Sequence, residues 1–344
     1  MSRPSLVVLD DREGLIGSSA GVARMREIAD VRVLDGSLDQ LSPAEREEVS
    51  VLMPVRERTQ LDADTLSQLP SLELILQTGG HANHLDAAHA VDRHIPVALG
   101  RRALGPRAAV TELTFALAVA ALRNLPAAHR SMVEGEWQPF VGRTLGGRTL
   151  GILGFGRHGT NVARIARAYG MKVLVWQRVD SHGGAPEDEY ERVPLDDLLS
   201  SSDIVSIHLK LSDESRGLLD SERLKRMKQG SVLINTSRGA IVDEDALVAA
   251  LRGGPLAAAG LDVFTQEPLP ADSPLRSLPN VVLTPHIGWT VEEVLIEFAD
   301  IAADQLEQYL AGELRRSELL DAEVVVADGA MGGLAGGNDQ PDPH

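Results

Sequence analysis

Short apolar runs alternate with polar or amphipathic stretches of helix length, and this alternation restricts the fold more than any other feature of the chain. A first series of runs precedes residue 100, and a second lies between residues 148 and 285. The runs are 5–10, 30–34, 49–54, 72–78 and 95–99, then 148–153, 172–176, 203–209, 231–237, 260–264 and 281–285. Buried strands that alternate with helices form parallel sheets covered by helices on both faces. We therefore predict an α/β protein with two doubly wound parallel-sheet domains.

Two helical stretches organise these series into domains. Residues 111–124 are apolar with helical periodicity and contain neither glycine nor proline, so they predict a helix at the domain boundary. Residues 291–313 are also helical in pattern and no strand follows them, so this helix is expected to return to the first domain. The tail is rich in glycine and polar residues, which predicts disorder. The expected domains are 1–101 with 289–327, the inserted 102–288, and the tail 328–344.

Composition excludes several classes of function. The chain has 33 basic and 50 acidic residues among 344, a formal net charge of −17 that disfavours nucleic acid and anionic membranes as partners. It contains no cysteine, which excludes disulfides, thiol catalysis and thiolate metal sites and fits the cytoplasm. An acid follows within the first ten residues, and we expect no apolar run near the roughly 18 residues that span a bilayer.

A glycine-rich turn follows the first strand of the second series, in the stretch LGILGFGRHGTNVARIARAY. Gly154, Gly156 and Gly159 form G-x-G-x-x-G between a predicted strand and a predicted helix, which is the setting of a dinucleotide-binding turn. The helix N-terminus would meet the pyrophosphate with unpaired N–H groups and a partial positive charge. The alternative is an ordinary strand-to-helix turn. The intervening residues expected at the cofactor are Phe155, Arg157 and His158.

The second strand of this unit is not followed by an acid. An acidic residue there usually binds the ribose 2′-hydroxyl of NAD, whereas Gln177 and Arg178 stand in this chain. An amide and a guanidinium can bind a 2′-phosphate, so the pair favours NADP over NAD. The alternative is that Arg178 points to solvent.

From Gly135 to His286 the chain resembles the D-isomer-specific 2-hydroxyacid dehydrogenases, including phosphoglycerate dehydrogenases and glyoxylate/hydroxypyruvate reductases. The motifs that carry the resemblance are GEWQPFVGRTLGGRTLGILGFGRHG, DIVSIHLKLSDESRGLL, LINTSRGAIVDEDALVAAL and GLDVFTQEPLPADSPLRSLPNVVLTPHIG. It implies a Rossmann-type NAD(P)-binding domain inserted into a flavodoxin-like substrate domain. It also implies an oxidoreductase that interconverts a small 2-oxo acid and its D-2-hydroxy acid in a closing cleft, and a homodimer with residues 111–145 in its interface.

The resemblance assigns a catalytic trio. Arg238 in NTSRG matches the arginine that holds the substrate carboxylate and polarises its carbonyl, a task suited to a planar guanidinium. His286 in TPHIG matches the residue that donates and accepts the proton, and Glu267 in DVFTQEP matches the acid that orients this histidine. Taken singly, each could serve as a surface ion-pair or turn residue. Their positions at the carboxyl ends of successive strands favour one site.

Further cofactor contacts are implied by the same resemblance. Asp262 matches a residue near the nicotinamide carboxamide, although it could instead cap the next segment, and Thr236 lies beside the catalytic arginine. His208 and Lys210 fall in the stretch where the family usually has H-x-P, with Lys210 replacing the proline. Lys210 could approach a cofactor phosphate or face solvent.

The substrate side departs from the family pattern. QTGGHANHLD resembles the glycine loop whose N–H groups bind the substrate carboxylate, and its Gly79 and Gly80 are followed by His81 where a glycine is usual. Arg56 after a predicted strand and Trp289 are the other expected substrate contacts, although Arg56 could belong to a solvated charged loop. The nearby histidines raise a metal site as an alternative, but their spacing fits no common helical face, and we expect no metal. These are His81, His84, His89 and His94, with Asp86.

Two other functions stay open on the sequence. A nicotinamide-sensing binding protein, like the corepressors that share this fold, could keep the whole catalytic trio. Formate oxidation is disfavoured because that site would pair the histidine with Gln rather than with Glu267. Consumption of reduced cofactor in the presence of 2-oxo acids separates an enzyme from a sensor.

Overall fold

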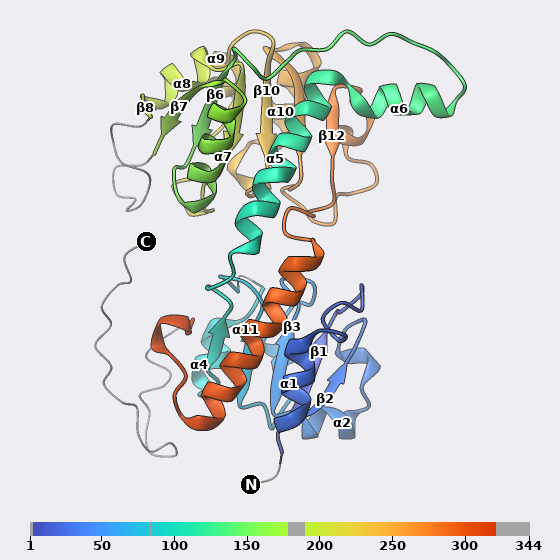
Figure 1. The fold of residues 1–344 in the computed structure, drawn as a ribbon, viewed down its shortest axis with the longest axis vertical. Helices are drawn as coiled ribbons and strands as arrows, with labels where there is room; N and C mark the ends of the chain where they lie inside the picture. The colour runs from blue at the N-terminus through green and yellow to red at the C-terminus, as the bar shows by residue number, and fades with distance from the viewer. Residues whose placement is uncertain (1–2, 83, 178–189, 321–344) are drawn as a thin grey trace. The chain divides into compact units, whose positions relative to one another are not determined.

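The computed structural model describes residues 3–82, 84–177 and 190–320. The chain divides after Gly105 and again after Thr290, so Pro106–Thr290 forms one compact unit and the described residues on either side of it form the other (Figure 1). The sequence pattern predicts these boundaries a few residues earlier, after residues 101 and 288. Both units contain a wholly parallel sheet, and the predicted α/β class with two doubly wound domains is confirmed.

The first unit contains a five-stranded sheet with the order β2-β1-β3-β4-β5. Each strand falls within one of the five predicted apolar runs, because residues such as Leu6–Leu9 and Leu74–Ile75 are buried on both faces of the sheet. The strands are β1 Ser5–Leu9, β2 Asp30–Val33, β3 Val51–Pro54, β4 Leu74–Gln77 and β5 Val97–Leu99. The helices are α1 Ala20–Ile28, α2 Pro43–Glu48, α3 Ala63–Ser67, α4 Ala87–Asp92 and α11 Glu292–Ala311.

Helix α11 follows the whole of the other unit in sequence but packs on α1 of the first. The two helices approach closely at Gly21, where a Cβ atom would lie 2.4 Å from the backbone carbon of Ala299. The carboxylate of Glu297 on α11 accepts hydrogen bonds from the backbone N–H groups of Leu104 at 2.7 Å and Gly105 at 2.8 Å. The two segments that leave this unit are therefore bonded to each other.

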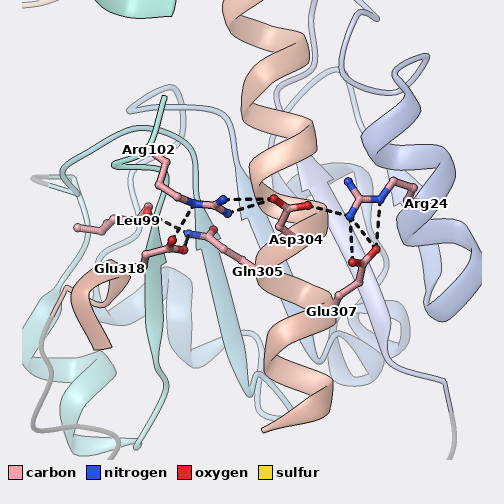
Figure 2. A network of polar contacts seen from close by, with 7 residues as sticks. All are labelled: Arg24, Leu99, Arg102, Asp304, Gln305, Glu307 and Glu318. Atoms are coloured by element: carbon pink, nitrogen blue, oxygen red, sulfur yellow. Dashed lines mark hydrogen bonds and ion pairs between the residues drawn. The ribbon is translucent and has the colours of Figure 1, made fainter. Parts of the chain in front are cut away.

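A polar network ties α11 to the rest of the first unit (Figure 2). Glu318 is 3% exposed, and its carboxylate lies 2.7 Å from Arg102 Nε and accepts from Gln305 Nε2 at 2.7 Å. Asp304 bridges Arg102 at 3.3 Å and Arg24 at 2.8 Å. A buried carboxylate is tolerated only when cations and hydrogen-bond donors surround it. These residues therefore form one connected network, and each depends on the others for its partners.

The second unit contains a seven-stranded sheet with the order β12-β11-β10-β9-β6-β7-β8. Strand β6 is the first strand of this unit in sequence and lies between β7 and β9, so the strand order reverses there. Open α/β sheets bind ligands in the crevice at such a point, here at the carboxyl ends of β6 and β9. The strands are β6 Thr149–Leu153, β7 Lys172–Trp176, β8 Glu191–Arg192, β9 Ile204–Ile207, β10 Ser231–Asn235, β11 Leu256–Leu261 and β12 Val281–Leu283. The helices are α5 Gly105–Arg123, α6 Leu125–Val133, α7 Arg157–Ala168, α8 Leu195–Ser201, α9 Ser221–Arg226 and α10 Glu244–Gly253.

Three elements of this unit differ from the sequence-based expectation. Strand β11 begins at Leu256, before the predicted run 260–264, and it ends at Leu261. The two-residue strand β8 is not predicted by the sequence, because Glu191 and Arg192 are both exposed and charged. Helix α5 begins at Gly105 rather than at residue 111.

Helix α5 also corrects the expectation that no apolar segment approaches membrane-spanning length. It has 19 residues and a mean hydropathy of 1.2, so it could cross a bilayer by length and composition alone. Its residues Phe115, Leu117, Ala118 and Leu122 are buried in the hydrophobic core with β6, β7 and β9, as in the core helix of a globular unit.

Candidate active site

The glycine turn joins β6 to α7 and has the backbone geometry that a dinucleotide-binding turn needs. Gly154 has φ +96°, and a Cβ there would lie 2.6 Å from the carbonyl oxygen of His208. At Gly159 a Cβ would lie 2.1 Å from the carbonyl oxygen of Gly154. Gly156 is the exposed residue that precedes α7, and a Cβ there would meet nothing within 4 Å. The first and third glycines therefore permit close packing, and the second leaves the backbone open to a phosphate, so the turn fits a dinucleotide.

The side chains of this turn differ in how far they are buried. Phe155 is 1% exposed and packs against Tyr190, with ring centroids 5.1 Å apart, so its side chain is a core group. Arg157 is exposed at the start of α7. His158 has a buried Nδ1 that no other part of the described chain hydrogen-bonds. Burial, and then the nearby cations Arg107, Arg157 and Arg238, lower the pKa of His158 to about 4, so its ring is neutral at neutral pH.

His208 follows β9 on the other side of the turn. Its Nε2 shares a hydrogen bond of 2.8 Å with Ser206 Oγ, and its backbone N–H donates to the Leu153 carbonyl at 2.7 Å. Burial, with a smaller contribution from His158, lowers the pKa of His208 to about 3, so this ring is also neutral. The side chain of Lys210 is exposed.

The end of β7 carries the group that would distinguish the two nicotinamide dinucleotides. Gln177 follows the strand, and its Oε1 accepts a hydrogen bond from Arg192 Nη1 at 3.3 Å. The guanidinium of Arg192 lies 5.8 Å from the ring centroid of Phe155, so it is close to the glycine turn. Arg178 lies outside the described residues. Sequence reasoning missed Arg192 because it belongs to the unpredicted strand β8.

Arg238 lies in a tight turn at the carboxyl end of β10. Asn235, 1% exposed, donates through Nδ2 to the Arg238 carbonyl at 3.0 Å and accepts from Ser237 N–H through Oδ1 at 3.0 Å. Arg238 Nη1 donates to the Ser237 carbonyl at 2.7 Å. Thr236 Oγ1 lies 3.1 Å from Thr114 Oγ1 on α5. These hydrogen bonds therefore fix the backbone conformation of the turn that carries the Arg238 guanidinium.

Glu267 and His286 form a close pair. His286 Nδ1 lies 2.6 Å from Glu267 Oε2, while Glu267 Oε1 accepts from the Phe264 N–H at 2.9 Å. Burial acts to raise the pKa of Glu267, but the hydrogen bond and charge of His286, the Phe264 N–H and Arg238 together lower it below its usual value. Glu267 is therefore ionised near neutral pH and engages Nδ1, which leaves Nε2 as the ring nitrogen oriented away from the carboxylate.

Asp262 supports the loop that carries His286. Its carboxylate is 1% exposed and accepts from Thr284 Oγ1 at 2.5 Å, from the Ile287 N–H at 2.9 Å and from the Gly288 N–H at 2.8 Å. Burial raises the pKa of Asp262, although these three bonds oppose the shift. His286 has φ +55°, so its conformation depends on such support. This role was not visible in the sequence, because all three partners lie more than twenty residues away and two of them are backbone N–H groups.

The expected substrate loop lies in the first unit, at the carboxyl ends of β3 and β4. Arg56 Nη1 donates to the Thr78 carbonyl at 3.4 Å, and a Cβ at Gly79 would lie 1.7 Å from that same nitrogen. The guanidinium therefore lies directly on Gly79, with Gly80 exposed beside it. His81 Nδ1 lies 2.9 Å from Glu57 Oε1, a partner that the sequence did not identify. Trp289 is in the other unit and is 9% exposed.

The histidines of this region do not form a cluster with metal-ligand geometry. Across residues 3–82, 84–177 and 190–320, no group of three His, Cys, Asp or Glu side chains could hold a metal ion. His84 is 5% exposed and His89 Nε2 lies 3.5 Å from Ser67 Oγ. His94 has φ +57° at the end of α4.

Comparison with known proteins matches the sequence of this chain to a known enzyme family. The family model described as D-isomer specific 2-hydroxyacid dehydrogenase, NAD binding domain, matches residues 115–288. The chain belongs to the D-isomer-specific 2-hydroxyacid dehydrogenase family. The range includes the glycine turn, Arg238, Glu267 and His286, and membership supports NAD-dependent 2-hydroxyacid dehydrogenase activity and confirms the resemblance seen in the sequence.

Individual relatives and solved structures are similar to this chain over most of its length. A glyoxylate reductase of Korarchaeum cryptofilum is 38% identical over 271 residues, which are 77% of this chain and 81% of that protein. The structure of a protein from Thermus thermophilus has a TM-score of 0.79 and 33% identity, covering 92% of this chain and 99% of that one. A D-lactate dehydrogenase from Aquifex aeolicus, solved with NAD and lactic acid, has a TM-score of 0.76 and 26% identity, covering 92% and 98%.

Proposed function

We propose that this protein reduces a small 2-oxo acid to the D-2-hydroxy acid, and catalyses the reverse reaction, with His286 as the acid and base. The observation that carries the proposal is the 2.6 Å contact between His286 Nδ1 and Glu267 Oε2. This contact orients the imidazole through one nitrogen and leaves the other for the substrate. Arg238 is close enough to lower the pKa of Glu267, so a cation for the substrate carboxylate accompanies the pair.

Arg238, His286 and Glu267 have separate roles in the proposed reaction. The bound nicotinamide supplies the hydride that reaches the carbonyl carbon. Arg238 binds the carboxylate with its planar fork of N–H groups and polarises the carbonyl oxygen. His286 Nε2 gives a proton to that oxygen as negative charge develops on it, and Glu267 stabilises the positive charge that the ring carries before the transfer. In oxidation of the hydroxy acid, His286 Nε2 takes the hydroxyl proton instead.

The first unit contributes substrate contacts in this proposal. The N–H groups of Gly80 and its neighbours bind the substrate carboxylate, as in the resemblance to the family, and Arg56 keeps Gly79 in place. His81 contacts the rest of the substrate. Trp289 follows the loop that carries His286, and in this proposal its ring provides an apolar contact for the substrate. Glyoxylate reductase activity of a relative supports a small 2-oxo acid as the substrate.

For the cofactor, we propose NADP in preference to NAD. The position of the ribose-binding acid is held by Gln177, which would not repel a 2′-phosphate. Arg192 donates to Gln177, so its guanidinium lies beside the expected position of the 2′-phosphate, and Arg192 rather than Arg178 is the described arginine that supports this preference. A charge-assisted bond to phosphate contributes about 1.5–3 kcal/mol.

A homodimer is the proposed assembly. Helix α6 and the segment after it expose large apolar side chains, with Trp137 86% exposed, Val141 101%, Val133 72% and Met132 56%. Such a patch on one short stretch is typical of a protein interface. It lies within the range 111–145 that the family resemblance places in the dimer contact. Sedimentation analysis of the wild type and of Trp137→Lys checks this, since the variant should be monomeric.

The activity is tested by one screen. Glyoxylate, pyruvate and hydroxypyruvate are offered with NADH and with NADPH, and loss of reduced cofactor is followed by absorbance. We expect turnover with at least one of these acids and a higher kcat/KM with NADPH. Arg192→Ala should weaken NADPH binding about 10- to 100-fold and leave NADH binding unchanged. Tight cofactor binding without turnover of any acid would instead identify a nicotinamide sensor, and equal affinities in wild type and variant would refute the NADP preference.

A further inference from the structure

The ring of His158 is a polar group in the glycine turn whose role the turn itself does not explain. His158 is the second residue of α7, which begins at Arg157, and Gly156 before the helix supplies no side-chain cap. The Nδ1 atom is buried and has no hydrogen-bond partner in the described chain, and of the two ring nitrogens only Nδ1 is enclosed in this way. A buried polar atom without a partner lowers stability, so such a group is expected where it serves a ligand.

The ring of His158 lies on the side of the turn where β9 and β10 end. In an α-helix the Cα–Cβ bond tilts toward the N-terminus, so a side chain in the first turn of α7 extends back toward the glycines. After burial, the charges of Arg107, Arg157 and Arg238 lower its pKa. Burial, and then His158, lower the pKa of His208. Because Arg238 follows β10 and His208 follows β9, the ring is close to the half of the sheet on the far side of β6 from β7.

This half of the sheet corresponds to one half of a dinucleotide. A doubly wound sheet binds a dinucleotide across the point where the strand order reverses, with one mononucleotide on each half. The ribose of the adenosine half belongs at the end of β7, so the nicotinamide mononucleotide half belongs at the ends of β9 and β10. Three guanidinium groups act on the His158 ring, and the N-terminus of α7 adds a partial positive charge. These surroundings favour a ligand with anionic oxygen atoms, as a nucleotide phosphate has.

The burial of Nδ1 determines which form of the ring is present. A proton on Nδ1 would be a buried donor without an acceptor, so the neutral ring carries its proton on Nε2. A second proton would have to bind at Nδ1, and burial together with the nearby cations holds the pKa of His158 at about 4. His158 is therefore a neutral donor through Nε2 near neutral pH.

We propose that His158, as a neutral ring, donates a hydrogen bond from Nε2 to an oxygen atom of the nicotinamide mononucleotide half of the bound dinucleotide. The oxygen belongs to the phosphate or to a ribose hydroxyl of that half. Backbone N–H groups at the start of α7 bind the pyrophosphate independently, so His158 adds one side-chain contact to theirs. The proposal needs only the dinucleotide site of the family and neither the substrate nor the NADP preference proposed above.

Titration of both cofactors against His158→Ile tests this contact without any turnover. Isoleucine cannot donate, so the Kd of NADH and the Kd of NADPH should rise by the same factor, about 10-fold, the effect of one hydrogen bond. The equal factor separates His158 from Arg192, whose replacement should affect NADPH alone. Tm should not fall, because isoleucine removes a buried polar atom that has no partner. His158→Gln keeps an N–H donor and should recover part of the affinity.

Fragments of the cofactor, measured in competition with NADH, locate the contact. AMP lacks the nicotinamide mononucleotide half and should bind the wild type and His158→Ile equally. ADP-ribose contains the phosphate and the ribose of that half and should show the full loss. ADP contains this phosphate without the ribose, so a loss with ADP assigns the contact to the phosphate, and no loss assigns it to a ribose hydroxyl. His89→Ile makes the same change in the first unit, where the ring lies near Ser67, and should leave every Kd unchanged.

Three results would overturn the proposal. A Kd for NADH in His158→Ile within about twofold of the wild-type value would show that the side chain does not contact the cofactor. An equal loss for AMP and ADP-ribose, with a lower Tm, would show damage to the turn. The ratio of the two Kd values, variant to wild type, should be constant from pH 8 to pH 6, and a ratio that grows as the pH falls would show a protonated ring in the complex instead of a neutral donor.

Discussion

Replacement of Asp262 by Asn tests whether the histidine loop depends on one buried carboxylate. Asp262 Oδ1 accepts from Thr284 Oγ1 and the Ile287 N–H, while Oδ2 accepts from the Gly288 N–H at 2.8 Å. An asparagine has one acceptor oxygen and one NH2 group. If its oxygen keeps the first two bonds, the NH2 group faces the Gly288 N–H, and two donors oppose each other in a site that is 1% exposed.

The loss of stability in Asp262→Asn can be estimated from the one hydrogen bond that the amide cannot accept. A buried donor without a partner costs about 1–3 kcal/mol. The neutral amide recovers part of this, because burial already raises the pKa of Asp262 and so penalises the carboxylate charge. We therefore expect a loss of about 1–2 kcal/mol in unfolding free energy, which lowers Tm by about 2–8 °C for a unit of this size. A loop that shifts by about 1 Å should lower kcat 10- to 100-fold, because His286 moves with it.

The assay compares Asp262→Asn with Asp243→Asn. Asp243 is an exposed N-cap whose side chain accepts from the Ala246 N–H at 3.0 Å, and Asn caps a helix as well as Asp does. Thermal unfolding, kcat and the Kd of the cofactor are measured for both. Unchanged Tm and kcat in Asp262→Asn would refute the reasoning, and a loss of cofactor affinity with normal kcat would show that Asp262 contacts the nicotinamide instead.

Three further outcomes are expected. His286→Gln should lower kcat/KM by about 10²- to 10⁴-fold in steady-state assays and leave the cofactor Kd, measured by titration, unchanged; near-native turnover would remove the acid–base assignment. Gly159→Ala should lower Tm, because its Cβ would overlap a backbone oxygen at 2.1 Å, whereas Gly156→Ala should keep Tm but weaken dinucleotide binding; equal Tm losses would contradict the packing argument. The pKa of His158 is about 4 in the folded protein and 6.5 in the unfolded chain, so the unfolded chain binds more protons between these two pH values. The stability that the neutral ring contributes above pH 6.5 is therefore lost as the pH falls toward 4. His158→Ile should therefore reduce the loss of unfolding free energy between pH 7 and pH 5, measured in urea, by about 1–2 kcal/mol, and an unchanged loss would exclude this histidine.

Much of the fold could be predicted because continuous buried runs mark the strands of a parallel sheet. Strand β11 shows where this fails. Its sequence, LAAAGL, has low strand propensity, so the pattern favours the following apolar run instead. The glycine of this strand has a tertiary reason, since a Cβ at Gly260 would lie 2.8 Å from Leu117 Cβ on α5. A helix that packs this closely on a strand leaves no mark in the local pattern.

The candidate site was predictable to a similar extent. Ordered motifs identify Arg238, Glu267 and His286, and the structure places the last two in contact. Two of the three partners of Asp262 are backbone N–H groups, and a sequence does not specify which backbone groups a side chain will reach. Glu57 had a signal, as an acid between two arginines at the carboxyl end of a buried strand, but its pairing with His81 depends on the turn that follows β4.

The division of the first unit into two stretches of chain has a consequence for synthesis on the ribosome. Residues 106–290 are made as one continuous piece, so that unit can fold as soon as it emerges. The five strands before it are made first, yet they wait for α11, which packs on α1 and bonds to Leu104 and Gly105 through Glu297. During that interval Arg102 has neither Asp304 nor Glu318 as a partner. The stretch before residue 106 therefore reaches its native state after the unit that follows it, and its five-stranded sheet remains without the packing of α11 until that helix is made, which is an interval in which an exposed apolar surface can aggregate.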